Sequence, residues 1–259
     1  MTRFSALSLN VNMGLEMSRR RFILPALRDA IRSVDADVVL LQEVLGEHAG
    51  FARRHAGWPS QSQHEYLADT SWPHHAYGRN AVFDAGHQGN AVLSRFPISS
   101  QRNHDVSIAG HEPRGLLHVE IAVPGLDAPL HVVSVHLGLR EAHRREQVAA
   151  LCRLVARAIP ADAPLLVAGD FNDWRMRGHA PLLSTGLHEA FETAHGRLAR
   201  TFPARAPLLP LDRMYLRNLR AAELHVFSQR PWNRMSDHAA LHAELTAQDT
   251  THGEGATIS

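Results

Sequence analysis

Eight short apolar segments, spread along most of the 259 residues, constrain the fold more than any other feature. Two segments have clear helical spacing. One starts at Pro25 and carries Leu27, Ile31 and Val34 on one face, and the other is centred on Leu151. Many strands with few helices predict stacked sheets flanked by helices rather than a simple alternating βα fold. The expected strands span residues 3–10, 37–42, 90–95, 115–123, 130–136, 164–169, 211–217 and 236–245.

The chain shows no internal repeat, no Gly/Ser-rich linker and no break in composition. We therefore expect a single domain over residues 1–246, followed by a polar, disordered tail over 247–259. Residues 50–75 contain His, Trp and Pro without clear periodicity, so we expect a long surface excursion there.

All 27 Lys+Arg residues are arginine, and the formal net charge is +1. The absence of lysine excludes Schiff-base chemistry and a phosphate-loop lysine. We attribute the all-arginine set itself mainly to codon bias. A near-zero net charge argues against strong charge-driven binding of nucleic acid. The sequence has no segment typical of a signal peptide or a membrane span, so a cytoplasmic location is expected, and nothing indicates an obligate protein partner.

Residues that can bind a metal or transfer a proton follow several of the expected strands. Such endings are common individually, and Gly-Asp or Asn-Asp pairs also form ordinary turns. Glu43 follows a continuous apolar run, where a carboxylate is costly unless it is paired or bound to a metal. Together these residues predict a functional site at one rim of a pair of sheets. They are Asn10, Glu43, His136, Asp170, Asn172, Asp237 and His238.

The oxygen-rich composition of this set indicates the metal. Carboxylate and amide oxygens favour Mg²⁺, with Mn²⁺ as a substitute, over Zn²⁺. Asp212 lies in an apolar run and can orient a histidine, as the acid of a catalytic triad does, or form an ion pair with Arg213.

In order along the chain, these motifs resemble the endonuclease/exonuclease/phosphatase superfamily, which includes DNase I-like nucleases, sphingomyelinases and inositol-polyphosphate phosphatases. The resemblance covers roughly residues 3–245. Within the superfamily, the chain is similar to a bacterial branch. It implies a DNase I-like, four-layer α/β sandwich of two packed mixed β-sheets flanked by helices. The motifs are Asn10-Val11-Asn12, Leu41-Gln42-Glu43-Val44, the segment 89–95, Val135-His136-Leu137, Gly169-Asp170-Phe171-Asn172 and Ser236-Asp237-His238.

The resemblance also assigns a role to each residue of the motifs. It implies that Glu43 is the principal metal ligand, with Asn10 beside it, and that Asp237 completes the network around the metal and the water. Asp170 and Asn172 position the attacking water and the phosphate. His238, oriented by Asp212, is the general base or the phosphate-stabilising group, and His136 is a second catalytic histidine. Arg114 and Asn90 are further candidates for contact with the substrate phosphate.

Three functions are compatible with the sequence. The first is a Mg²⁺-dependent phosphodiesterase that attacks nucleic acid with an in-line water. The second is the same chemistry on a phospholipid head group or a small phosphoester. Trp58, Trp72, Trp174 and Trp232 could form an apolar rim for it, or they pack in the core and in loops. The third is a binding protein that keeps the fold without catalysis, which ranks last because the catalytic set is complete.

Overall fold

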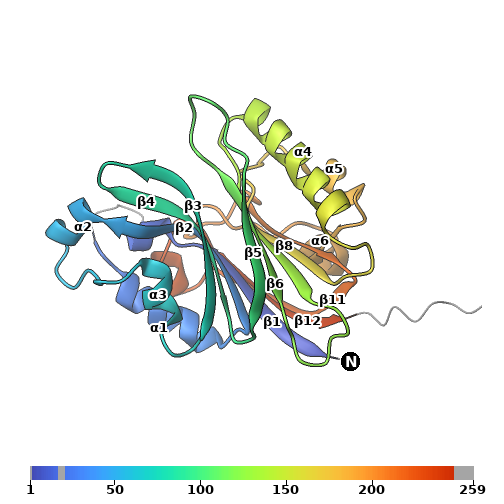
Figure 1. Cartoon of the computed structure of the whole chain (residues 1–259), viewed down its shortest axis with the longest axis horizontal. Coiled ribbons are helices and arrows are strands. Elements are labelled where there is room, and N and C mark those ends of the chain that lie inside the picture. Colours follow the sequence, from blue (N-terminus) through green and yellow to red (C-terminus); the bar gives the residue numbers. More distant parts are fainter. Residues whose placement is uncertain (1, 17–20, 248–259) are drawn as a thin grey trace, which may run out of the picture.

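The computed structural model describes residues 2–16 and 21–247, and these form two six-stranded mixed sheets packed face to face (Figure 1). The first sheet has the order β11-β12-β1-β2-β4-β3, and the second has the order β5-β6-β7-β8-β10-β9. The first sheet consists of β1 (Arg3–Asn10), β2 (Val38–His48), β3 (His74–Phe83), β4 (Gly86–Ser94), β11 (Leu219–Phe227) and β12 (Ala240–Ala247). The second consists of β5 (Ile98–Asp105), β6 (Gly115–Ile121), β7 (Leu130–His136), β8 (Leu165–Asp170), β9 (His188–Glu189) and β10 (Asp212–Arg217).

Helices cover the outer face of each sheet, which gives four layers (Figure 1). On the first sheet, α1 (Leu24–Val34) and α3 (Gln63–Ala68) share one apolar cluster with β1, β2 and β4. On the second sheet, α4 (Glu141–Ala158) and α5 (His179–Leu183) share another cluster with β7 and β8. A third cluster lies between the sheets. The expected four-layer α/β sandwich is therefore confirmed.

Several elements were not expected from the sequence. They are β3, β5, β9 and β11, the short helices α2 (Ala49–Arg54), α3, α5 and α6 (Ala190–His195), and the 3₁₀ turns Asn12–Gly14 and Trp232–Arg234. The strands at both sheet edges are half exposed, so their apolar alternation is weak in the sequence.

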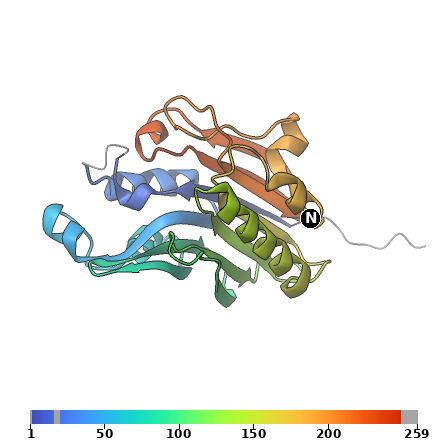
Figure 2. The same cartoon turned by 90° about the horizontal axis from the view of Figure 1, so that it is seen from above.

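The interpretation of residues 50–75 as a surface excursion was wrong for its second half. Leu67 and Trp72 are fully buried in the cluster that α1 and α3 cover, and the Trp72 indole donates a hydrogen bond to the Ala36 carbonyl (2.8 Å). The first half does carry α2 away from the body of the molecule, at the end of the long strand β2 (Figure 2).

The expected tail lies almost entirely outside the described residues, because only Ala247 of residues 247–259 is described, at the end of β12. The single-domain boundary at residue 246 stays a prediction. No helix in the described ranges combines the length and the apolar character that crossing a membrane requires.

The topology brings distant segments to one rim of the sandwich. β1 and β2 run parallel, so Asn10 lies beside Gln42 where both strands reach this rim. β7 and β8 also run parallel, which places His136 beside Asp170. β10 begins at Asp212, directly opposite Asp170 in the antiparallel pairing. Five strands therefore deliver polar residues to the same end of the core.

Buried histidines predict a loss of stability in mild acid. Burial lowers the pKa of His64 on α3 to about 4, with a smaller contribution from His75, and its ring stacks on Tyr77 at 4.7 Å. In the unfolded chain the same imidazole has a pKa near 6.5. The unfolded state therefore binds more protons below pH 6.5, so this stability is present above pH 6.5 and is lost progressively toward pH 4.

The variant His64→Phe keeps the stack on Tyr77 and removes the titration. Between pH 7.5 and pH 5, we expect the melting temperature of the wild type to fall by several degrees more than that of the variant. In a protein of this size, each kcal/mol lost from the free energy of unfolding lowers the melting temperature by roughly 2–4 °C. Scanning calorimetry at both pH values measures the difference. An equal loss in the two proteins would contradict the assignment.

Candidate active site

Asp170 lies at the centre of the polar cluster at the rim. It is 1% exposed and ends β8, and its carboxylate contacts two amides. Asn10 Nδ2 donates to Asp170 Oδ2 (3.3 Å), and Asn172 donates to Asp170 through both its backbone N–H (2.9 Å) and its Nδ2 (3.2 Å). Burial raises the pKa of Asp170 to about 7, although the charge of His238 opposes this. A carboxyl group with such a pKa is suited to proton transfer near neutral pH.

A buried pair of Asp212 and His238 faces Asp170. His238 Nδ1 lies 2.8 Å from Asp212 Oδ2, and His238 Nε2 lies 3.8 Å from Asp170 Oδ2. Burial by itself lowers the pKa of His238, but the carboxylates of Asp212, Asp170 and Asp237 outweigh it and raise the pKa to about 10. The Nε2–Asp170 distance is longer than a direct hydrogen bond, so Nε2 keeps its capacity to bind another oxygen.

Glu43 reaches the cluster because β2 contains a bulge. The β2–β4 register shifts between Leu41 and Val44, and Glu43 has φ of 56°, a left-handed value that is rare for glutamate. Leu41 and Val44 nevertheless pack in the same core cluster. A regular strand would place residues three apart on opposite faces, so the extra residue is what leaves both Gln42 and Glu43 away from that core.

The side chain of Glu43 accepts a hydrogen bond from Asn10 Nδ2 (3.2 Å). One amide group therefore bridges the carboxylates of Glu43 and Asp170. Gln42, which received no role from the sequence, is buried and donates to Ser134 Oγ of the other sheet (3.3 Å).

His136 and Asp237 complete the predicted set at the rim. His136 Nε2 is 3.6 Å from Asp170 Oδ2, and burial, aided by the charge of Arg114, holds the pKa of His136 well below its ordinary value. Asp237 is half buried, and its Oδ1 lies 3.3 Å from Ser236 Oγ.

Ser236 is a residue to which the sequence assigned no role. Its hydroxyl donates to the Asn10 carbonyl (2.6 Å) and accepts from the His238 backbone N–H (3.1 Å), so it ties β1 to the segment before β12. Its place in the Ser236-Asp237-His238 motif was the only signal in the sequence.

Arg114 and Asn90 line a pocket of about 220 Å³ beside His136. Arg114 Nε donates to the Leu137 carbonyl (3.3 Å), which holds the guanidinium at the edge of the site. Asn90 is buried and donates to the carbonyls of Gly115 (3.0 Å) and Ser134 (3.3 Å), so its amide nitrogen is occupied by backbone. Within the described residues its Oδ1 has no hydrogen-bond partner.

Gly169 allows Asp170 to reach its position. Its φ is 142°, and a Cβ added there would lie 2.0 Å from the Val135 carbonyl oxygen of the neighbouring strand. We expect Gly169→Ala to lower the free energy of unfolding by more than the 1–3 kcal/mol that an unfavourable backbone conformation costs, because the clash adds to the strain. Gly110→Ala is the matched control, since Gly110 has φ of 76° and no atom within 4 Å of its added Cβ. Urea unfolding measures both, and equal losses would contradict the steric argument.

The rim next to Asn172 exposes large apolar side chains. Leu139 is 52% exposed, Trp174 41% and Met176 51%. The Trp174 ring lies under the guanidinium of Arg144 (4.4 Å), which is itself buried, so this indole is fixed in place.

The donor set fits a divalent cation. Ligand atoms of Asp170, Asp212 and His238 lie within 4.8 Å of one another, and Glu43 joins them through Asn10. Asp212 Oδ1 is buried without a hydrogen-bond partner in the described part of the chain, a costly state for a carboxylate oxygen. Mostly oxygen donors with one imidazole suit Mg²⁺ or Mn²⁺.

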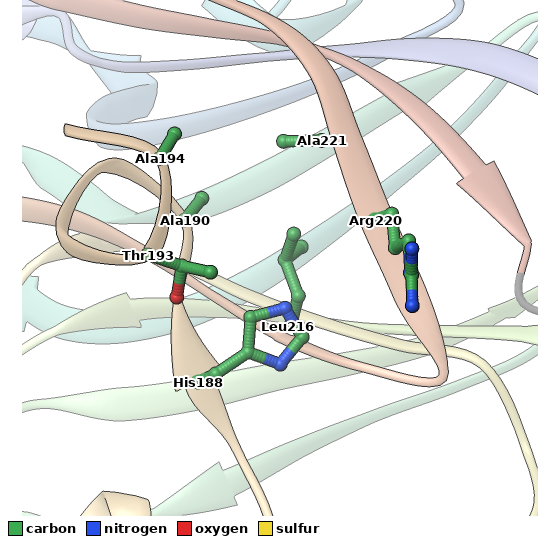
Figure 3. A pocket seen from close by; sticks show the side chains of 7 residues that line it. All are labelled: His188, Ala190, Thr193, Ala194, Leu216, Arg220 and Ala221. Carbon is green, nitrogen blue, oxygen red and sulfur yellow. The ribbon is translucent and has the colours of Figure 1, made fainter.

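A separate pocket of about 390 Å³ lies beside α6 (Figure 3). Arg220 and His188 are its charged and titratable groups, and mostly small apolar side chains form the rest of its wall. Its lining includes none of the residues predicted to act in catalysis, so it is distinct from the rim site.

Comparison with known proteins places this geometry in a family. The sequence profile of the Endonuclease/Exonuclease/phosphatase family matches residues 7–238. The chain belongs to this family. It is therefore a metal-dependent phosphoric ester hydrolase. A relative from Escherichia coli K12, the uncharacterized protein YbhP, is 51% identical over 243 residues, which cover 93% of this chain and 96% of that protein.

Solved structures of the family have the same fold. An endonuclease/exonuclease/phosphatase from Bacteroides vulgatus superimposes with a TM-score of 0.75 at 17% identity, covering 96% of this chain and 100% of that one. A protein of the same description from Beutenbergia cavernae superimposes with a TM-score of 0.74 at 19% sequence identity, covering 96% of this chain and 72% of that one. A humanized D. rerio TDP2 superimposes with a TM-score of 0.69 at 20% sequence identity, covering 95% of this chain and 99% of that one.

Proposed function

We propose that the protein is a Mg²⁺-dependent phosphodiester hydrolase that acts on nucleic acid. The observation that carries the proposal is the meeting of Asp170, the Asp212–His238 pair and the Asn10–Glu43 pair at one rim. Asp170 contacts Asn10 at 3.3 Å and His238 at 3.8 Å, and so it links the two pairs. These residues supply the groups that in-line attack of water on a phosphodiester requires.

Glu43 and Asn10 would hold the metal ion, with Asp237 completing the network around it. When bound, Mg²⁺ supplies charge that polarises a phosphoryl oxygen and stabilises the leaving oxygen. The amide nitrogen of Asn10 contacts both Glu43 and Asp170, whereas its Oδ1, the atom that would bind the metal, accepts from the Asn12 backbone N–H at 3.0 Å.

Asp170 orients the attacking water and accepts its proton. Asn172 Nδ2 donates to both Asp170 and the Leu137 carbonyl and so fixes the carboxylate of Asp170 in place. Asp212 fixes the ring of His238 through Nδ1, so that Nε2 points toward Asp170 and the reacting phosphate. His136 Nε2 lies 3.6 Å from Asp170 Oδ2, and Arg114 adds a positive charge in the neighbouring pocket. Asn90 supports this wall through backbone carbonyls.

Metal removal tests the proposal directly. We expect purified protein treated with EDTA to lose activity on bis-p-nitrophenyl phosphate and on plasmid DNA, and Mg²⁺ or Mn²⁺ to restore it. Because phosphate contacts release counterions, activity on DNA should fall as salt rises from 50 to 200 mM, while activity on the small ester should change little. Full turnover in EDTA would contradict the proposal.

A second candidate substrate is a phospholipid head group or another small phosphoester. The exposed side chains of Leu139, Trp174 and Met176 favour it, because an apolar rim next to the site can contact acyl chains. Trp174→Ala should then reduce activity on phospholipid vesicles several-fold and leave bis-p-nitrophenyl phosphate unaffected. Cleavage of lipid without cleavage of DNA or RNA would replace nucleic acid as the proposed substrate.

A further inference from the structure

A second cluster of metal-binding side chains lies far from the rim, on β6 and β7. In the antiparallel pairing of these strands, Glu120 lies directly opposite His131, and His118 is two residues from Glu120 on the same face. This is the outer face of the second sheet, since the neighbouring Leu116 and Val133 pack toward α4. His131 precedes His136 by five residues on one strand, so the cluster is about 16 Å from the catalytic rim.

The three side chains are close enough to share one ion. His118 Nε2 and His131 Nδ1 are 2.9 Å apart, and a Glu120 carboxylate oxygen lies within 4.8 Å of both. Two nitrogen ligands on a tetrahedral Zn²⁺ are about 3.3 Å apart, given Zn–N distances of about 2.0–2.1 Å. The imidazoles would thus separate by only a few tenths of an ångström to bind the metal.

The surroundings keep both imidazoles in the form that binds metal. His118 and His131 are 7% and 4% exposed, and burial lowers the pKa of both, that of His118 to about 4. A neutral imidazole binds metal through its unprotonated nitrogen, so the single hydrogen between Nε2 and Nδ1 would have to move to the other nitrogen of its ring. His104 on β5 stacks beside His118 at 6.2 Å, and its buried Nε2 has no hydrogen-bond partner in the residues that the structure describes.

We propose that His118, Glu120 and His131 form a zinc site that ties β6 to β7 at the end of the sheet opposite the catalytic rim. Two imidazoles and one carboxylate are donors that Zn²⁺ prefers, whereas the catalytic set is rich in the oxygen donors that Mg²⁺ prefers. The two sites therefore differ in the metal they select. This inference does not depend on the proposed substrate.

The test titrates Zn²⁺ into full-length protein that carries Glu43→Gln, which weakens the catalytic metal site, with a chromophoric chelator as competitor. We expect one equivalent of Zn²⁺ to bind and to raise the melting temperature by several degrees. Adding His131→Gln should weaken this binding at least tenfold, while His225→Gln, at an exposed histidine of β11, should not change it. In a protein with Glu43 intact, His131→Gln should keep its Mg²⁺-supported hydrolase activity.

Glu120→Gln provides a second variant if the loss of a buried imidazole prevents folding, since Glu120 is only partly buried and the change preserves its size. It should also weaken Zn²⁺ binding at least tenfold. Equal affinity in the Glu43→Gln protein with and without Glu120→Gln or His131→Gln would overturn the site and assign the ion to surface histidines. The absence of any Zn²⁺ binding would overturn it as well, without affecting the hydrolase proposal.

Discussion

The substitution His238→Gln is expected to lower kcat for phosphodiester hydrolysis by about 10²–10⁴-fold, the range that a positioned proton-transfer or charge-stabilising group contributes. Glutamine retains a hydrogen-bond donor toward Asp212, so the buried carboxylate keeps a partner, but it cannot carry the positive charge of the imidazolium. Steady-state kinetics with bis-p-nitrophenyl phosphate and saturating Mg²⁺ measures the loss, and KM should change much less than kcat.

His225→Gln is the matched control for this prediction, because the His225 ring is half exposed on β11 and pairs with Glu223 at the surface. It should keep full activity. Asp212→Asn should reproduce most of the loss of the His238 variant through the orientation and charge of the ring, as loss of the acid does in a catalytic triad. Near-normal kcat in folded His238→Gln, verified by circular dichroism, would refute the assignment.

Glu43→Gln is expected to raise the Mg²⁺ concentration needed for half-maximal activity at least tenfold and to lower the activity at saturation. The amide preserves size and the contact with Asn10, but it removes the negative charge that a hard divalent cation requires. Activity measured against Mg²⁺ concentration separates the two effects. Stabilisation by Mg²⁺ in a thermal melt should be reduced in the same variant, because only the folded state holds the ion.

Glu47→Gln is the control for the metal prediction, since Glu47 lies four residues further along β2 and is exposed. It removes one carboxylate from the same strand without altering the rim. An unchanged Mg²⁺ dependence in Glu43→Gln would show that Glu43 is not a metal ligand. Loss of activity in both variants would indicate a general effect of charge.

The glycines and bulges around the site show why its residues cannot be replaced independently. Glu43 and Asn172 both have positive φ, of 56° and 49°, and Gly169 approaches the backbone of β7 closely. Such conformations are costly unless the surrounding structure holds them, and they occur often at functional sites. Here the two packed sheets hold them, so part of the stability of the core is used to keep the polar cluster in place.

The sequence by itself determined the layers of the fold and most members of the polar cluster. Continuous apolar runs such as Val38–Leu41 and Leu165–Ala168 are buried on both faces in any packed sheet, and their polar endings mark the rim. It did not predict the edge strands, the burial of Trp72 or the role of Ser236. Those depend on contacts between segments distant along the chain, which leave no local periodicity.

Only the tertiary structure decided how the charged groups act on one another. The motif marks His238, but the sequence cannot tell that two carboxylates on other strands help to raise the pKa of His238 while burial lowers that of His118. The same holds for Glu43, which reaches Asn10 only because β2 bulges. Desolvation and Coulomb interactions depend on distance in space, and the spatial neighbours of a residue follow from the packing of the sheets rather than from its position in the chain.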